Sequence, residues 1–187
     1  MLVLAAGGSR RLGRPKQLVA SAGQALVART VGLARALGPR WLGVVLGAGA
    51  GRVAPALNGL ADEIIVARDW HAGMAASLRR GLGRVPADAR YLLVMTVDQW
   101  QLQSRDLAHL LAAAGRIPVA AAYEGRLGVP AIFPRAYLKR LRALRGDQGA
   151  RRLLAEGTAI AVPMPSAAAD LDTPADLAAF RAGPRPA

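Results

Sequence analysis

The chain has 187 residues, 53% of them hydrophobic and 20% charged, which is typical of a folded globular protein with one sizeable core and excludes a disordered chain. It contains no cysteine and two histidines, which excludes disulfides, thiolate metal sites and a multi-histidine metal site. The net charge of +13 suggests a nucleic-acid partner, but the arginines are spread along the chain and aromatic residues make up only 4%, so nucleic acid is not the partner we expect.

Short apolar runs alternate along the chain with longer stretches of helical periodicity. The runs predict strands buried on both faces; they cover Met1–Ala5, Trp41–Leu46, Glu63–Ala67, Tyr91–Val97, Val119–Tyr123, Ala131–Phe133 and Ala159–Pro163. The periodic stretches predict helices; they cover Gln24–Leu37, Gly73–Leu82, Ser104–Ala114, Ala136–Leu144, Gln148–Glu156 and Pro174–Phe180. Ser104 is the expected N-cap of one helix, and Thr173 followed by Pro174 that of another.

This alternation predicts an α/β fold, a three-layer α/β/α arrangement with a mainly parallel mixed sheet. Ligands of such sheets bind at the carboxyl ends of the strands, which directs attention to the loops after residues 5, 46, 67 and 97. We expect one domain over residues 1–181 and a flexible tail over residues 182–187. The start MLVLAAGG is too short for a signal segment and no apolar run reaches the roughly 18 residues of a membrane span, so we predict a cytoplasmic protein without a membrane partner.

The loop LAAGGSRRLGRPKQL, residues 4–18, follows the first predicted strand. Its glycines, Gly7, Gly8 and Gly13, do not have the spacing of a dinucleotide-binding loop. Gly8 and Gly13 fit a P-loop, but Arg14 and Pro15 stand where that motif requires lysine and a hydroxyl residue. A purely structural glycine turn is the remaining alternative.

The chemistry of this loop suits a triphosphate. Gly7 and Gly8 allow backbone N–H groups to approach a phosphate closely. Arg11 and Lys16 add positive charge, and a guanidinium binds two phosphate oxygens at once. We therefore predict a triphosphate site here.

The whole stretch resembles the signature LAAGxSxRMGxPKxL of nucleotidyltransferases of the GT-A-like superfamily, in particular of molybdenum cofactor cytidylyltransferases. The segment DWHAGMAASLRRGL, Asp69–Leu82, resembles a second family segment that lies near base and ribose; a helix start with a glycine turn is the alternative. The resemblance implies a GT-A-like fold and a nucleotide site formed by Leu4, Ala5, Ala6, Gly7, Gly8, Ser9, Arg11, Lys16, Gly73, Met74, Ser77 and Asp98.

Acidic residues at two places predict a magnesium site. In YLLVMTVDQWQL, Asp98 ends an apolar strand, where a carboxylate is well placed to hold Mg²⁺ against a triphosphate. The family has Asp-Gln-Pro here, and Trp100 replaces the proline. The segment ADLDTPADLAAF resembles the family's closing motif, from which Asp170 or Asp172 completes the site; Asp170 is slightly favoured, and helix capping is the alternative for Asp172.

Two further segments resemble the family's acceptor side. YEGRLGVPAIFPR matches at Gly128 and Pro130, but Val129 stands in place of a histidine. RGDQGARRLL matches almost throughout and offers Asp147 and Arg151, for which an i,i+4 ion pair at a helix start is equally plausible. With Gln99 beside Asp98, these residues form the expected acceptor site.

The activity implied by the resemblance is Mg²⁺-dependent nucleotidyl transfer, with Arg11, Lys16 and Asp98 as catalytic residues and no protein nucleophile. CTP and molybdenum-loaded molybdopterin are the expected substrates, and a molybdoenzyme or its chaperone is a potential partner. Trp100 and Val129 keep a different substrate pair open: GTP, or a sugar- or polyol-phosphate acceptor. From another class, a non-catalytic protein that delivers the cofactor to molybdoenzymes is the alternative.

Overall fold

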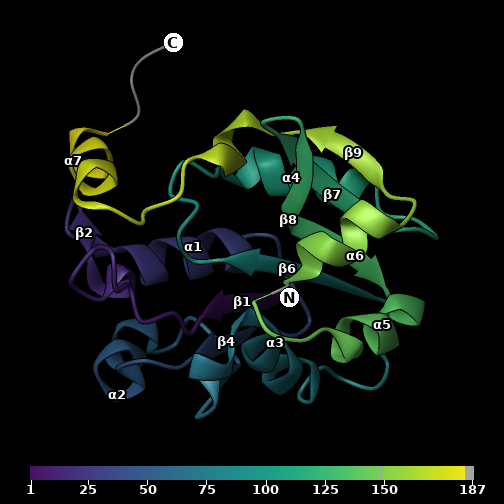
Figure 1. Ribbon diagram of the computed structural model, residues 1–187, viewed down its shortest axis with the longest axis horizontal. Coiled ribbons are helices and arrows are strands. Elements are labelled where there is room, and N and C mark those ends of the chain that lie inside the picture. The colour runs from purple at the N-terminus through teal and green to yellow at the C-terminus, as the bar shows by residue number, and fades with distance from the viewer. Residues whose placement is uncertain (148, 184–187) are drawn as a thin grey trace.

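The computed structural model describes residues 1–147 and 149–183 and is built on a seven-stranded sheet (Figure 1). Its strand order is β5-β4-β1-β6-β8-β7-β9, where β1 is Leu2–Ala5, β4 Gly43–Leu46, β5 Glu63–Val66, β6 Tyr91–Thr96, β7 Val119–Tyr123, β8 Arg126–Pro134 and β9 Ile160–Pro163. All neighbouring strands pair in parallel except that β8 runs antiparallel to β6 and β7. The predicted mixed, mainly parallel sheet is confirmed.

Helices cover both faces of the sheet because its central strands are apolar on both sides. In β1, Val3 and Ala5 face one core and Leu2 and Leu4 face the other. The first core is closed by α1 (Leu26–Arg35), α4 (Ser104–Ala112) and α7 (Pro174–Ala182); the second by α3 (Met74–Leu82), α5 (Leu138–Ala143) and α6 (Ala150–Glu156). The expected three-layer arrangement is therefore present.

The structure differs from the sequence prediction mainly at edges and short elements. The edge strands β5 and β9 are largely exposed rather than buried on both faces, because each has a neighbour on one side only. The pair β2 (Ala20–Ser21) and β3 (Gln24–Ala25) and the short helix α2 (Ala50–Val53) were not expected, and β8 is much longer than Ala131–Phe133.

Helix ends follow the expected capping in one case and not in another. The N-cap of α4 is Gln103, not Ser104, and Asp106 completes its capping box. At α7 the predicted cap is confirmed, because the Thr173 side chain accepts a hydrogen bond from the backbone N–H of Asp176. The expected tail starts at Ala182, which is the last residue of α7; residues 184–187 lie outside the described residues, as does Gln148, the expected first residue of α6.

The topology brings the predicted site loops to one edge. Strands β5, β4, β1 and β6 are parallel neighbours, so the loops after residues 5, 46, 67 and 97 leave the sheet on the same side. An isolated antiparallel bridge between Gln99 and Asp170 then ties the segment before α7 to the end of β6. No helix among the described residues is long and apolar enough to cross a membrane.

Candidate active site

The glycine loop after β1 is held in shape by side chains of the loop itself. The Gln17 amide donates to the carbonyls of Ala5 (2.8 Å) and Gly7 (2.9 Å), and its side chain is buried. The Ser9 hydroxyl accepts from the backbone N–H of Lys16 at 3.1 Å. Leu4, Ala5 and Ala6 are buried, so their contacts to a ligand are limited to the backbone, whereas Gly7 and Gly8 are exposed.

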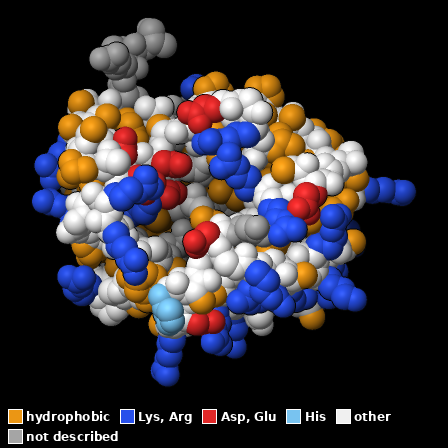
Figure 2. Space-filling model, in the orientation of Figure 1, with side chains coloured by type: hydrophobic (Ala, Val, Ile, Leu, Met, Phe, Trp, Pro, Cys, Tyr) orange, Lys and Arg blue, Asp and Glu red, His pale blue; other side chains and the backbone are white. Residues whose placement is uncertain are grey.

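Three aspartates from two distant segments meet at the carboxyl end of β6. The backbone N–H of Leu171 donates to the Asp98 carbonyl (3.0 Å), and that of Trp100 to the Ala169 carbonyl (3.2 Å). These two hydrogen bonds fix Asp170 next to Asp98. Figure 2 shows acidic side chains beside a hollow in the middle of this face, with basic side chains around it.

Lys16 is the central cation of this cluster. Its ammonium lies 2.8 Å from Asp98 Oδ2 and 2.6 Å from Asp172 Oδ1, and only 10% of its side chain is exposed. Burial alone lowers the pKa of Lys16, but the charges and hydrogen bonds of both aspartates outweigh burial and raise it above its ordinary value. Lys16 therefore stays protonated.

Arg11 completes the ion-pair network from the outer side. Its guanidinium contacts Asp172 Oδ2 at 2.5 Å and is 72% exposed. Both oxygens of Asp172 are thus engaged, one by Lys16 and one by Arg11. Helix capping at α7 is performed by Thr173 and Asp176, so the alternative capping role of the Asp172 side chain is not observed.

Asp98 and Asp170 keep carboxylate oxygens that no donor satisfies. Asp98 Oδ1 is buried and has no hydrogen-bond partner, and within the described part of the chain no donor bonds to the Asp170 carboxyl group. Burial and the negative charges of Asp98 and Asp172 raise the pKa of Asp170 to about 7, although Lys16 and Arg126 act in the opposite direction. Two neighbouring carboxylates with free oxygens form an arrangement that a cation would stabilise.

These oxygens suit a hard divalent cation. The described residues contain no group of three His, Asp or Glu side chains that could hold a metal ion on their own. Magnesium bound with a nucleotide does not require one, since one or two carboxylates and phosphate oxygens suffice. The orphaned Asp98 Oδ1 and the free Asp170 carboxyl group supply these carboxylates, so the residues present fit the ion.

On the predicted base side, Gly73 lies against the loop before α6. Its φ is +99°, and a Cβ there would come within 2.5 Å of the Gly146 carbonyl group and 2.7 Å of Asp147 Oδ1. The backbone N–H of Ala75 donates to the Gly146 carbonyl (3.0 Å). Asp147 is thus placed beside a predicted nucleotide contact rather than among the other acceptor residues.

The remaining residues predicted on the nucleotide side differ in access. Met74 is 42% exposed at the start of α3, whereas Ser77 is buried in that helix. Arg151, which was predicted on the acceptor side, is exposed on α6. Within the described residues no ion pair joins it to Asp147, so the i,i+4 pairing is not observed.

The predicted acceptor residues next to Asp98 are mostly buried. Gln99 is 2% exposed, and its amide donates to the carbonyls of Val129 (2.8 Å) and Ala167 (2.9 Å). Direct contact of Gln99 with an acceptor does not fit this geometry, because both amide hydrogens are used and the side chain is enclosed. Gly128 and Pro130 are also buried; a Cβ at Gly128 would collide with the Tyr123 hydroxyl group, so this glycine makes room for the tyrosine.

Three polar residues of the site were not singled out in the sequence. Gln17 shapes the glycine loop, and it stands beside Lys16 in the quoted motif. Tyr123 and Arg126 come from the β7–β8 hairpin; the Arg126 charge lowers the pKa of both Asp170 and Tyr123, and the Asp170 charge raises that of Tyr123. No sequence pattern indicates that Tyr123 and Arg126 lie near Asp170, because only the fold brings this hairpin to the aspartate.

A family model and a known relative match most of this chain. Residues 1–161 match the model of the MobA-like NTP transferase domain. The chain is 33% identical over 183 residues to a molybdenum cofactor guanylyltransferase of Rhodobacter capsulatus, an alignment that covers 95% of this chain and 92% of the relative.

Solved structures show the same fold. Rv0371c of Mycobacterium tuberculosis H37Rv, in complex with manganese, is similar with a TM-score of 0.82 and 27% identity over 98% of this chain and 97% of that chain. Molybdopterin-guanine dinucleotide biosynthesis protein A of Archaeoglobus fulgidus is similar in fold, with a TM-score of 0.68 and 17% identity over 97% of this chain and 96% of that chain.

Proposed function

The chain belongs to the MobA-like NTP transferase domain family and is a nucleotidyltransferase, and we propose that it transfers CMP from CTP to the phosphate of molybdenum-loaded molybdopterin. The main support for this proposal is that Lys16 and Arg11, which follow the glycine loop in the chain, form ion pairs with the aspartates at the end of β6. In the reaction, an acceptor phosphate oxygen bonds to the α-phosphorus of CTP, the bond from that phosphorus to the β-phosphate breaks, and pyrophosphate leaves.

Positioning and charge stabilisation perform this chemistry, so no protein nucleophile is needed. The backbone N–H groups of Gly7 and Gly8 bind phosphate oxygens, and the Gln17 hydrogen bonds keep the loop in place. When the triphosphate binds, Lys16 and Arg11 give up some of their contacts with the aspartates and bind phosphate oxygens instead. There they stabilise the charge that develops on the leaving pyrophosphate.

Asp98 and Asp170 would hold Mg²⁺, since the oxygens of Asp172 are already paired with Lys16 and Arg11. When bound, the ion supplies positive charge to the α-phosphate oxygens. The manganese complex of the mycobacterial neighbour supports a divalent ion at this fold, and Mg²⁺ is the ion we assign.

The loop sequence supports CTP, because LAAGGSRRLGRPKQL resembles, among the nucleotidyltransferases with this signature, the molybdenum cofactor cytidylyltransferases in particular. Guanylyl transfer to the same acceptor is the second candidate, and it is favoured by the guanylyltransferase relative that aligns over almost the entire chain. The two candidates differ in the base alone, so the same phosphate and metal residues serve both.

Pyrophosphate release measured with Mg²⁺, molybdenum-loaded molybdopterin and either CTP or GTP tests the proposal. We expect release with CTP, and a loss of about 10²–10³-fold in kcat for Asp98→Asn, whose folding is checked by thermal unfolding. Asp88→Asn is the control, because Asp88 is an exposed partner of Arg40. Faster turnover with GTP would select the second candidate, and unchanged turnover of Asp98→Asn would refute the metal assignment.

A further inference from the structure

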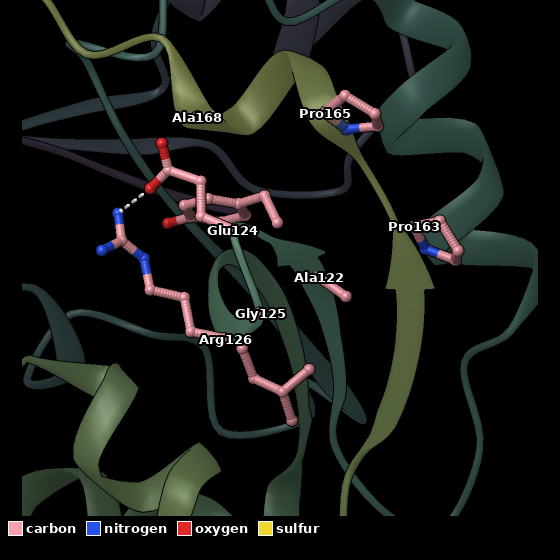
Figure 3. A pocket seen from close by; sticks show the side chains of 9 residues that line it. Ala122, Glu124, Gly125, Arg126, Pro163, Pro165 and Ala168 are labelled. Carbon is pink, nitrogen blue, oxygen red and sulfur yellow. Dashed lines mark ion pairs between the residues drawn. The ribbon is translucent and has the colours of Figure 1, made fainter.

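A cavity of about 530 Å³ lies between the β7–β8 hairpin and the segment that leads from β9 into the turn η5 (Pro165–Ala168) (Figure 3). Its lining is mostly apolar and includes flat side chains, namely Tyr123, Pro163 and Pro165, together with the charged pair Glu124 and Arg126. A largely apolar cavity of this size with a few polar groups is typical of a small-molecule site.

Glu124 occupies a backbone position that does not favour glutamate. It has φ +47° and Gly125 has φ +71°, between the paired residues Tyr123 and Arg126. Two positive φ angles in a two-residue hairpin turn normally select Asn, Asp or Gly. Backbone preference therefore does not account for Glu124, whereas a role for its carboxylate does.

The Glu124 carboxylate forms one ion pair and can accept further hydrogen bonds. Glu124 Oε2 pairs with the Arg126 guanidinium at 2.8 Å, and the two side chains are 55% and 37% exposed. The same guanidinium lies 5.2 Å from the centre of the Tyr123 ring. A carboxylate accepts about four hydrogen bonds, so Glu124 retains acceptor capacity beside an aromatic face.

The cavity is joined structurally to the aspartate cluster. Gln99, the neighbour of Asp98, donates to the carbonyl of Val129 in β8 and to that of Ala167 in η5. It thus ties β8 and η5, two elements that also contribute lining residues to the cavity, to the residue that follows Asp98. A molecule in the cavity therefore lies on the acceptor side of the proposed reaction, opposite the glycine loop.

The geometry points to this cavity as the site for the heterocyclic end of the acceptor, a flat aminopyrimidinone ring such as a pterin. Its two adjacent N–H groups would donate to the Glu124 carboxylate, and its faces would pack against Tyr123 and the prolines. This inference rests on the proposed function, and it adds the residues that select the acceptor: Glu124 and Tyr123 for the ring, with Gln99 as a positioning residue.

Fluorescence titration with two soluble probes tests the inference. The first is 6-hydroxymethylpterin, and the second is 6-hydroxymethyllumazine, in which an oxygen replaces the 2-amino group that donates to the carboxylate. We expect the pterin to bind at least about 10-fold more tightly than the lumazine. Glu124→Gln should remove this preference, while Glu124→Asp should keep part of it.

Two further measurements separate recognition from folding. Glu124→Gly relieves the positive φ, so it should raise Tm and still lose the pterin preference, a combination that a structural role does not produce. Stabilisation of Glu124→Gln by CTP and Mg²⁺ should equal that of the parent chain. Equal binding of both probes to the parent chain, absence of pterin binding, or an unchanged preference in Glu124→Gln would each overturn the inference.

The outcomes also distinguish this inference from the proposed function. Glu124-dependent pterin binding without pyrophosphate release would contradict the proposed transfer and leave the pterin site standing. Pyrophosphate release with an unchanged KM for molybdopterin in Glu124→Gln would support the transfer and contradict the assignment of the cavity.

Discussion

Replacing Asp170 by asparagine should stabilise the protein at neutral and alkaline pH in the absence of divalent metal. The folded-state pKa of Asp170 is about 7 against an ordinary value of 3.8, because the carboxyl group is partly buried beside Asp98 and Asp172. The raised pKa means that the folded state binds the proton more tightly than the unfolded state. The stabilising effect of that proton is complete below about pH 3.8, declines as the pH rises, and is lost above about pH 7.

The size of the stabilisation by Asp170→Asn follows from the pKa shift of Asp170. Each pKa unit corresponds to about 1.4 kcal/mol, so a shift of about 3 units sets an upper limit of about 4 kcal/mol. Solvent screening at this partly exposed site reduces our expectation to about 2 kcal/mol. For a chain of this length that corresponds to an increase in Tm of about 4–8 °C for Asp170→Asn at pH 8.

The assay is thermal unfolding of both proteins from pH 4 to pH 8.5 with EDTA, repeated at pH 8 with Mg²⁺ and CTP. The difference in Tm should be near zero at pH 4, grow up to about pH 7 and then stay constant. With Mg²⁺ and CTP the order should reverse, because the asparagine variant lacks one proposed ligand. A Tm difference that is independent of pH would refute the argument that the ionised Asp170 destabilises the fold.

Two more substitutions test packing around the site. Gly73→Ala places a Cβ against the Gly146 carbonyl group at a positive φ, so it should lower the free energy of unfolding by about 1–3 kcal/mol and weaken CTP binding, both measurable by denaturant titration and thermal shift. Trp100→Pro removes the N–H that donates to Ala169 and the ring that meets Phe180 edge-on at 5.6 Å, so it should lower the free energy of unfolding by about 3–5 kcal/mol.

Gly73→Ala and Trp100→Pro each have a control variant. Gly125→Ala also adds a Cβ at a positive φ, +71°, but with open space around it, so it tests a positive φ without collision and should leave CTP binding unchanged. Trp100→Leu keeps the N–H and loses the ring, and it should be less destabilising than Trp100→Pro. Equal effects of Gly73→Ala and Gly125→Ala on CTP binding would contradict the role assigned to the contact with Gly146.

The elements that could be predicted from the sequence are those with a regular pattern of apolar residues along the chain. The strands β1, β4 and β6 were predictable because helices cover both of their faces, which leaves uninterrupted apolar runs. The start of β8 was missed because Arg126 and Leu127 carry no such pattern. The pair β2 and β3 was missed because strands of two residues show no periodicity.

In the site, residues within a motif could be predicted, whereas contacts between distant segments could not. Lys16, Asp98 and Asp172 were predicted from motifs, and the structure brings both aspartates within hydrogen-bond distance of the Lys16 ammonium group. The burial of Gln99 was not predictable, because the two carbonyls that it satisfies are supplied by segments 30 and 68 residues away in the chain. Likewise, only the folded structure shows that Trp100, which replaces the family's proline, uses its backbone N–H.

Lys16 and Arg11 neutralise the aspartates with the same positive groups that a triphosphate requires. A nucleotide that draws these cations toward its phosphates leaves the carboxylates uncompensated, and a divalent ion that occupies the carboxylates releases the cations. Each ligand thus removes an obstacle to the binding of the other. We therefore expect the ion-pair network to make binding of nucleotide and metal cooperative, and by linkage each should increase the affinity for the other by the same factor.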